Sequence, residues 1–240
     1  MPFFAIAAVV GVLWLLIWQT FPALDAHVHH HQGRGAWTGI AQVLADGGHL
    51  RAFALTGTMM LAGFLVIPYI TIYLQSNSGM RADQVPWIYL CGGVATLLTG
   101  RWIGRLSDRL GKAHVFRRMA LLLPLPLMAT TLSEGLPLWA LLLISTSLFT
   151  VMSGRMIPGM ALIASAAQPH LRGTFMSLNA AVQSAAMGVA AFAGGLIIGR
   201  DEQGHLTHYW VAGLLGSLLS LATLWLVSRV RVHGTATPPR

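Results

Sequence analysis

The length, composition and charge of the chain exclude a soluble globular protein. Of its 240 residues, 55% are hydrophobic and only 9% are charged, whereas a typical soluble domain carries about 25% charged residues. So few charges could not solvate the surface of a soluble fold of this size. A membrane span needs roughly 20 apolar residues, so the chain has room for about seven spans and their loops.

The formal net charge of +8 is compatible with nucleic-acid binding or with the excess of positive residues found in cytoplasmic loops of membrane proteins. The apolar composition favours the second interpretation, and we expect no nucleic-acid partner. The single cysteine, Cys91, excludes a disulfide framework and a thiolate-cluster metal site.

Apolar windows, all uncharged except for Arg155 in the fifth, predict an all-α, polytopic membrane bundle of about seven transmembrane helices. The windows are residues 1–21, Arg51 to Arg81, Asp83 to Arg101, a weaker one from Arg118 to Glu134 interrupted by Pro124 and Pro126, 137–165, 172–200 and 209–229. We expect residues 1–21 to form a first helix, 22–50 a cytoplasmic linker, 51–231 a six-helix bundle and 232–240 a cytoplasmic tail.

Positive residues predict the orientation of these helices. Twelve of the fifteen fall in one set of loops: Arg34, Arg51, Arg101, Arg105, Arg109, Lys112, Arg117, Arg118, Arg172, Arg229, Arg231 and Arg240. The opposite loops contain only Arg81 and Arg200. The positive-inside rule therefore places the C-terminus in the cytoplasm and Met1 outside. Because no positive residue precedes the first helix, we expect the sequence to begin within a longer protein, with a signal peptide as the less favoured alternative.

The linker contains four closely spaced histidines, His27, His29, His30 and His31. Imidazole suits zinc, copper or nickel, but no cysteine or carboxylate cluster accompanies them. A solvated linker is the favoured interpretation, so neither a metal nor a cofactor is expected.

A specific pattern connects the third and fourth predicted helices. Gly104, Asp108, Arg109, Gly111 and Lys112 form the spacing G-x-x-x-D-R-x-G-K. Gly104 allows close approach of helices, and Gly111 allows a tight reversal with positive φ. Asp108 is an acid among six basic residues, placed to pair with them or to cap a helix. The alternative is a short basic loop that only anchors topology.

This segment resembles the signature loop of the major facilitator superfamily. Residues 153–159, Ser-Gly-Arg-Met-Ile-Pro-Gly, resemble that family's arginine-and-glycine motif, and residues 172–179 with Gln183 and Gly194-Gly195 resemble helix eleven of its drug:proton antiporters. The resemblance covers nearly the whole chain and implies helices six to twelve, the C-terminal half of such a transporter, with the N-terminal part missing. One departure is that Ala190 and Ala191 stand where the antiporter motif of the fifth helix has a glycine-proline pair.

The resemblance implies a gate and a cavity. Asp108 and its basic neighbours would hold the cytoplasmic ends of the third and sixth helices together, and breaking that contact would allow alternating access. Arg155, followed by Gly159, is the one charge well inside a predicted helix; it either faces a partner or wet cavity, or reaches the headgroups. Candidate cavity residues are Tyr69, Tyr73, Gln75, Asn179 and Gln183, each of which has helix–helix hydrogen bonding as its alternative role.

Together with the predicted membrane bundle, the resemblance implies a multi-pass, secondary active transporter in a bacterial inner membrane. It would export small drug-like or metabolite molecules, with protons as the coupling ion. All seven acidic residues lie in loops or at helix ends, so the proton site is expected in the missing part. A non-transporting fragment and a seven-helix receptor or scaffold are the alternatives. An enzyme is not expected, because Val151 stands where the nucleophile motif of an intramembrane serine protease, around Ser153-Gly154, requires glycine.

Overall fold

The computed structural model describes residues 2–20 and 36–230. The four linker histidines and the tail 232–240 lie outside the described residues. The chain forms two compact units, 1–38 and 39–240, which are considered separately.

The first unit contains helix α1 (Pro2–Thr20). Its side chains from Phe4 to Trp18 are largely exposed and apolar, and the rings of Trp14 and Trp18 stack with centroids 5.7 Å apart. A helix that is apolar on all sides needs an apolar environment, and the crossing expected at 1–21 stays a prediction.

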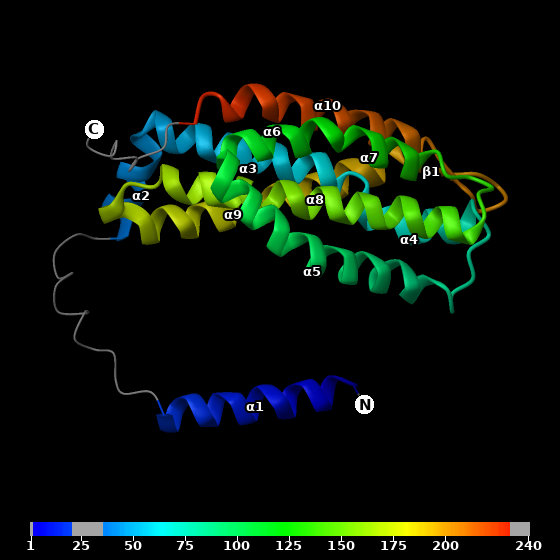
Figure 1. Cartoon of the computed structure of the whole chain (residues 1–240), viewed down its shortest axis with the longest axis horizontal. Coiled ribbons are helices and arrows are strands. Elements are labelled where there is room, and N and C mark those ends of the chain that lie inside the picture. Colours follow the sequence, from blue (N-terminus) through cyan, green and yellow to red (C-terminus); the bar gives the residue numbers. More distant parts are fainter. Residues whose placement is uncertain (1, 21–35, 231–240) are drawn as a thin grey trace. The chain divides into compact units, whose positions relative to one another are not determined.

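The second unit is almost entirely helical (Figure 1). After α2 (Ala36–Ala45) come α3 (Gly47–Phe64), η2 (Ile67–Tyr69), α4 (Ile70–Ser76), α5 (Val85–Leu110), α6 (Lys112–Leu122), α7 (Pro124–Thr131), α8 (Leu138–Ala166), η3 (Pro169–Leu171), α9 (Arg172–Ile197), the strands β1 (Gly199–Arg200) and β2 (Leu206–Thr207), and α10 (Tyr209–Val227). The two strands pair antiparallel.

Every window predicted to be helical contains helix, and two are interrupted at proline. The window from Arg51 to Arg81 becomes α3, η2 and α4, with Pro68 in the 3₁₀ turn. The fourth window is divided between α6 and α7 at Leu123, next to Pro124. Proline lacks the N–H that would continue the helical hydrogen bonds.

Four segments of the described chain are long and apolar enough to cross a membrane. They are Gly47–Ser76, Leu138–Ala166, Pro169–Ile197 and Tyr209–Val227. The expectation of three further crossings, by α1, α5 and α6–α7, stays a prediction.

The predicted linker 22–50 also contains regular structure. Residues Ala36–Ala45 form α2, and α3 begins at Gly47, four residues before Arg51. The bundle therefore starts earlier than the charge pattern indicates, because Asp46 caps α3 by accepting a hydrogen bond from the backbone N of Gly48 at 2.6 Å.

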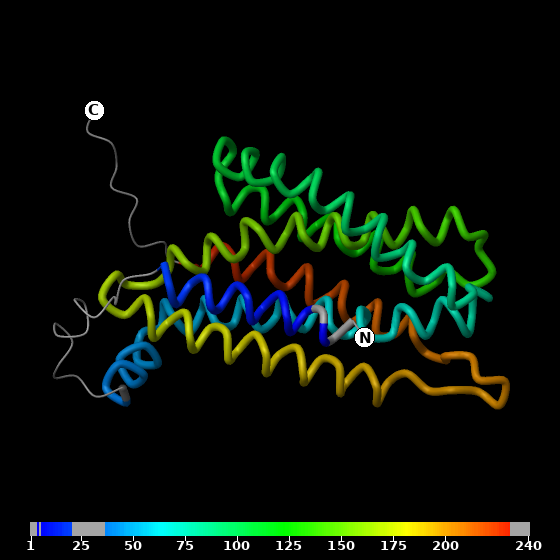
Figure 2. Tube along the Cα trace, turned by 90° about the horizontal axis from the view of Figure 1, so that it is seen from below, coloured from blue at the N-terminus to red at the C-terminus, as the bar shows by residue number. Residues whose placement is uncertain are grey.

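Helix α8 lies in the middle of the second unit. Helices α5 and α6 pack along α8, α3 packs against α9 and α10, and α7 packs against α10. Figure 2 shows α9 running beside α3 and the β1–β2 hairpin at the end remote from α2. Asn77 fastens this hairpin, since its side chain both donates to and accepts from the backbone of Leu206 at 3.0 and 2.9 Å.

A polar junction joins α2 and α3 to the connection between α8 and α9. His49 is fully buried and packs on the ring of Phe175, with centroids 4.9 Å apart. Its Nε2 accepts from the backbone N of Gln168, and the Gln168 side-chain amide donates to Asp46 at 2.6 Å. The hydrogen bond from the Gly48 backbone, more than the nearby His49, holds the pKa of Asp46 below its usual value of 3.8, against a smaller effect of burial.

Candidate functional site

The basic turn between α5 and α6 has the geometry that its glycine predicts. Gly111 has φ +89°, a left-handed value that side chains disfavour, and it separates Leu110 from Lys112, where α6 begins. The Lys112 Nζ donates to the Ser165 Oγ of α8 at 3.3 Å. The turn is thus attached to α8 by its lysine.

The expected partners of Asp108 are not found. Asp108 and Arg109 are exposed, and Asp108 makes no ion pair or hydrogen bond with any residue that the structure describes. It does not cap α6, whose N-cap is Gly111 with no side-chain hydrogen bond. The predicted contact with α9 is also not seen, because α5 packs on α8 and α6 while α9 packs on α3. A Cβ on Gly104 would meet open space, so Gly104 mediates no close helix approach within the second unit.

Arg155 is buried at a junction of four helices. It has no exposed surface, so the alternative of a side chain that reaches the headgroups is excluded for this structure. Its Nη2 donates to the Met59 carbonyl of α3 at 2.9 Å, and its Nη1 to the Ser220 hydroxyl of α10 at 3.4 Å. Ser220 in turn donates to the Ala120 carbonyl of α6 at 2.9 Å.

No described acid forms part of the Arg155 junction. No ion pair to Arg155 is found within the described ranges, and its Nε has no hydrogen-bond partner there. Arg155 lies 11 residues before the end of α8, about 16 Å along the helix. An uncompensated charge at that depth is costly.

Gly159, one turn further on, makes room for this junction. A Cβ there would lie 3.0 Å from the Met59 Sδ and 3.1 Å from the Phe116 Cε2. Within the arginine-and-glycine motif, Gly159 therefore allows α8 to pack closely against α3 and α6.

The candidate cavity residues do not converge on one cavity. The Tyr69 hydroxyl donates to the Ala191 carbonyl of α9 at 2.6 Å, and a Cβ on Gly194 would lie 2.8 Å from the Tyr69 ring. The small residues in this part of α9 thus make room for the Tyr69 side chain, which connects the two segments. Asn179 is buried and accepts from the Thr56 hydroxyl of α3 at 2.6 Å, which is also a structural role.

The other three candidates have different surroundings. Tyr73 is buried against Tyr209, with ring centroids 4.5 Å apart, and borders a polar hollow beneath the β1–β2 hairpin. Gln75 is exposed, and Gln183 is half-buried.

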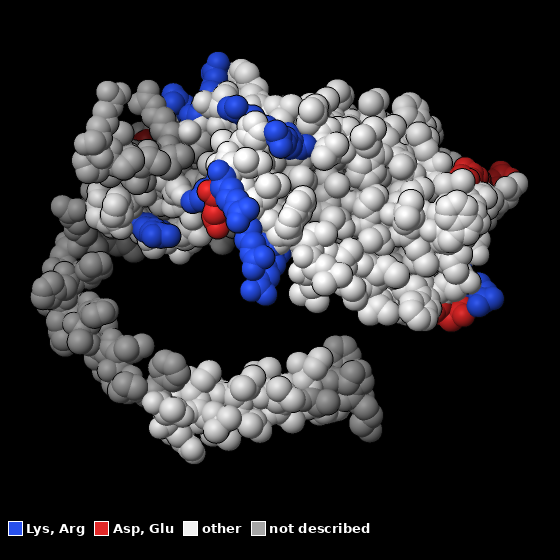
Figure 3. Space-filling view, viewed as in Figure 1, with Lys and Arg blue, Asp and Glu red and all other residues white. Residues whose placement is uncertain are grey.

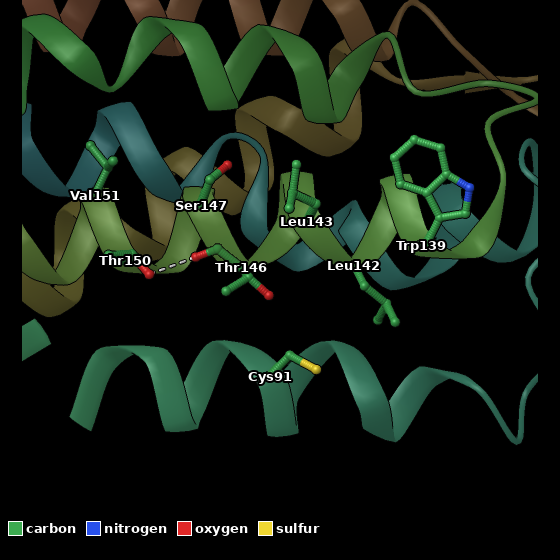
Figure 4. A pocket seen from close by; sticks show the side chains of 8 residues that line it. All are labelled: Cys91, Trp139, Leu142, Leu143, Thr146, Ser147, Thr150 and Val151. Carbon is green, nitrogen blue, oxygen red and sulfur yellow. Dashed lines mark hydrogen bonds between the residues drawn. The ribbon is translucent and has the colours of Figure 1, made fainter. Parts of the chain in front are cut away.

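The structure instead reveals a groove between α5 and α8 that the sequence reasoning missed. It has a volume of about 560 Å³ and is lined by Cys91, Trp139, Leu142, Leu143, Thr146, Ser147, Thr150 and Val151. In Figure 4, Leu142 and Thr146 point from α8 toward α5, which carries Cys91. The hydroxyls of Ser147 and Thr150 donate to carbonyls of their own helix, so the groove is apolar with a few satisfied hydroxyls.

A second hollow of about 390 Å³ continues along the same pair of helices. It is lined by Ile67, Tyr89, Gly92, Gly93, Thr96, Phe149, Met152, Ser153 and Met156. Gly92 brings α5 close to α8 here, since a Cβ on it would lie 2.5 Å from the Phe149 Cδ2. The spacing of Thr146, Thr150 and Ser153 on one helical face was the available signal for this surface.

Long apolar helices, a buried arginine and an uncharged groove define a polytopic membrane protein with a surface suited to small molecules. The comparison with protein families agrees, because the family model described as Major Facilitator Superfamily matches residues 52–240. The chain therefore belongs to the major facilitator superfamily of membrane transporters. Neither curated proteins nor solved structures gave a match.

Proposed function

We propose that this transporter exports small apolar or amphipathic molecules, drug-like compounds or metabolites, by alternating access in exchange for protons. The α5–α8 groove is the observation that supports this proposal most directly. Its lining contains leucine, valine, tryptophan, cysteine and hydroxyl side chains and no charged one. Such a surface favours uncharged or amphipathic ligands over strongly charged ones.

The proposed gate is the motif Gly104, Asp108, Arg109, Gly111 and Lys112. Residues 51–231 would form one of two six-helix bundles that rock about the transport path, as the family resemblance implies. Asp108 is exposed and unpaired within the described residues, so it is available to a partner from the other bundle. This supports contact with that bundle rather than with α9.

The proton-binding group would lie outside residues 51–231. Within this range the acids Asp83, Asp108, Glu134, Asp201 and Glu202 all occupy helix ends or loops. A proton relay works through ionisable groups inside the membrane. We place the transporter in a bacterial inner membrane with its C-terminus in the cytoplasm and assign it no enzymatic activity.

Transport by everted membrane vesicles from cells making the complete transporter tests the proposal. Uptake of a neutral lipophilic dye and of a lipophilic cationic dye is measured on energisation and after nigericin collapses the pH gradient. We expect energised uptake of at least one dye and its loss with nigericin. Uptake that persists after nigericin would contradict proton antiport, and no uptake of either dye would contradict the substrate class.

The gate is tested in the same vesicles with Asp108→Ala and the matched control Glu202→Ala, an exposed acid at the opposite end. We expect Asp108→Ala to lower the initial rate of uptake at an unchanged membrane level, and Glu202→Ala to retain the rate. Full activity of Asp108→Ala would remove Asp108 from the gate.

A further inference from the structure

A group of unpaired arginines covers neighbouring parts of α5 and α6. The α5–α6 arginine patch consists of Arg101, Arg105, Arg109, Arg117 and Arg118, all exposed. In Figure 3, basic side chains gather on one face over the end of α5 and the start of α6, with one acidic group among them. None of the five arginines makes an ion pair or a side-chain hydrogen bond with another described residue.

The spacing of the α5 arginines places them on one side of that helix. Arg101, Arg105 and Arg109 follow one another at intervals of four residues, which superimposes them on successive turns. The same side contains exposed apolar residues one to two turns earlier: Leu97 is 79% exposed and Leu98 is 73% exposed. The exposed side of α5 thus changes from leucine to arginine within about 10 Å of helix.

Trp102 occupies the boundary between these two regions. It is 63% exposed and lies one turn after Leu98 and about one turn before Arg105. Tryptophan is enriched where lipid tails meet headgroups, because its ring is apolar and its N–H is polar.

Helix α6 shows the same change in reverse order. Arg117 and Arg118 are followed by the exposed Leu121, Leu122 and then Leu125 of α7. Arg105 and Arg117 each lie six residues from Gly111, so the turn brings them to a similar height on adjacent antiparallel helices. The transition from apolar to basic therefore occurs at one level on both helices.

From this arrangement we infer that the α5–α6 arginine patch binds the headgroups of anionic phospholipids. Each guanidinium can donate two parallel hydrogen bonds to a phosphate. A headgroup at this level would neutralise arginines near which the described part of the chain places one acid, Asp108, and its acyl chains would lie along Leu98 and Leu122. The inference does not depend on which substrate is transported, and its test uses Arg105 and Arg117, which are not part of the proposed gate motif.

Two other arginines at the same end of the bundle provide a matched control. Arg172 begins α9, and the Arg229 guanidinium already lies over the Trp225 ring, 3.9 Å from its centroid. The double variants Arg105→Gln/Arg117→Gln and Arg172→Gln/Arg229→Gln remove the same charge from the same end. Only the first removes it from the patch.

Lipid binding is measured by native mass spectrometry of the full chain in detergent, titrated with phosphatidylglycerol or with phosphatidylcholine of the same acyl chains. We expect the wild type to bind phosphatidylglycerol at least fivefold more tightly, and the Arg105→Gln/Arg117→Gln variant to lose most of this preference. The control double variant should retain it. A rise from 50 to 500 mM salt should weaken the preference, because salt screens exposed charges.

Three results would overturn the inference. The first is an absence of preference in the wild type, and the second is an equal loss in both double variants, which would indicate only the general positive field of that end. The third is equal competition by water-soluble glycerol phosphate, which would indicate an anion site rather than a lipid site. The variant Arg105→Lys/Arg117→Lys keeps the charge without the forked geometry, so a folded protein with intermediate preference is expected, and thermal melting of each variant verifies folding.

Discussion

Arg155 combines full burial with the absence of an acid partner among the described residues. Removing a lone buried charge also removes the free-energy cost of its desolvation. Removing one of its hydrogen-bond partners instead leaves the charge less compensated and lowers the stability of the fold. A purely stabilising role therefore does not account for Arg155. This geometry favours a functional role for Arg155, maintained at a cost in the stability of the fold.

The substitution Arg155→Met tests that interpretation. Methionine fills a similar volume without charge, so we expect the melting temperature of the purified protein to be unchanged or higher, while transport in membrane vesicles is lost. Ser220→Ala should instead lower stability by about 1–3 kcal/mol, because it leaves the Nη1 of Arg155 without a partner. Loss of folding in Arg155→Met would show that the hydrogen bonds to Met59 and Ser220 outweigh the burial of charge.

Gly92 and Gly93 form a natural comparison at the groove. A Cβ on Gly92 would meet the Phe149 ring, whereas a Cβ on Gly93 has nothing within 4 Å. Replacing a helical glycine by alanine gains about 0.5–1 kcal/mol, and forcing a packed ring to move costs about 1–3 kcal/mol. We expect Gly93→Ala to be neutral or stabilising in thermal melts and Gly92→Ala to be destabilising. Equal melting temperatures would mean that Phe149 moves without cost.

At the scale of elements, the start of α3 depends on Asp46. Because the folded state holds the pKa of Asp46 below 3.8, its contribution to stability is present above that value and is lost as the pH falls through the folded pKa. We expect Asp46→Ala to lower stability at neutral pH by about 0.5–2 kcal/mol, the usual effect of a lost N-cap. Asp46→Asn keeps a capping oxygen but not the charge, so it should retain much of the stability.

Acid titration of the wild type and of Asp46→Asn, followed by circular dichroism melts, checks this expectation. The loss of stability below about pH 4 should be smaller in the variant, because its amide does not titrate. Identical pH dependence of the two proteins would show that other carboxylates, not the α3 cap, govern acid sensitivity.

The helices could be predicted from the sequence because charged residues bracket each apolar stretch. Gly111 could be assigned to a tight reversal for a similarly local reason, since only a positive φ connects α5 to α6 without a spacer. Helix α2 was not predicted, because its ten residues lie in a stretch with no long apolar run. The early start of α3 depends on Asp46, whose carboxylate accepts hydrogen bonds from the neighbouring Gly48 and from Gln168, 122 residues away.

The candidate cavity was harder to predict than the helices. The resemblance indicated which helices would line a cavity, and hydropathy does not state which side of a helix meets a neighbour, so Asn179 and Tyr69 were chosen on those helices by their polarity. In the fold Asn179 bonds to Thr56, 123 residues away, and Tyr69 bonds to Ala191. The α5–α8 groove forms between residues about 50 positions apart in the sequence, such as Cys91 and Leu142. Gly92 is the local residue that permits the two helices to approach each other there.

At the scale of the molecule, the two ends of the bundle differ sharply in charge. Among the described residues, the end at the start of α3 has nine lysines and arginines and two acids, whereas the hairpin end has two arginines and four acids. One of those two arginines, Arg81, is bound by Asp83, with Nη2 and Oδ2 2.9 Å apart. The difference in available positive charge is therefore greater than the counts alone indicate.

The positive-inside rule turns this asymmetry into a prediction of orientation. Cys91 is the only cysteine, so Cys91→Ser gives a background in which single cysteines report exposure. We choose Gln203→Cys at the hairpin and His114→Cys on α6, both at exposed positions. In intact cells a membrane-impermeant maleimide should label Gln203→Cys, and it should label His114→Cys only after permeabilisation.

The opposite labelling pattern would invert the orientation, and its consequences would extend beyond topology. The α5–α6 arginine patch would then face the outer leaflet, where it would not meet the negative surface potential characteristic of the cytoplasmic leaflet. Asp108 would lie at the outer end of the transport path, and a gate there would close the outward-open state instead of the inward-open one. Because the arginine patch and the gate share this one orientation, the labelling experiment tests the two proposals together, while the variants of Arg105 and Asp108 distinguish between them.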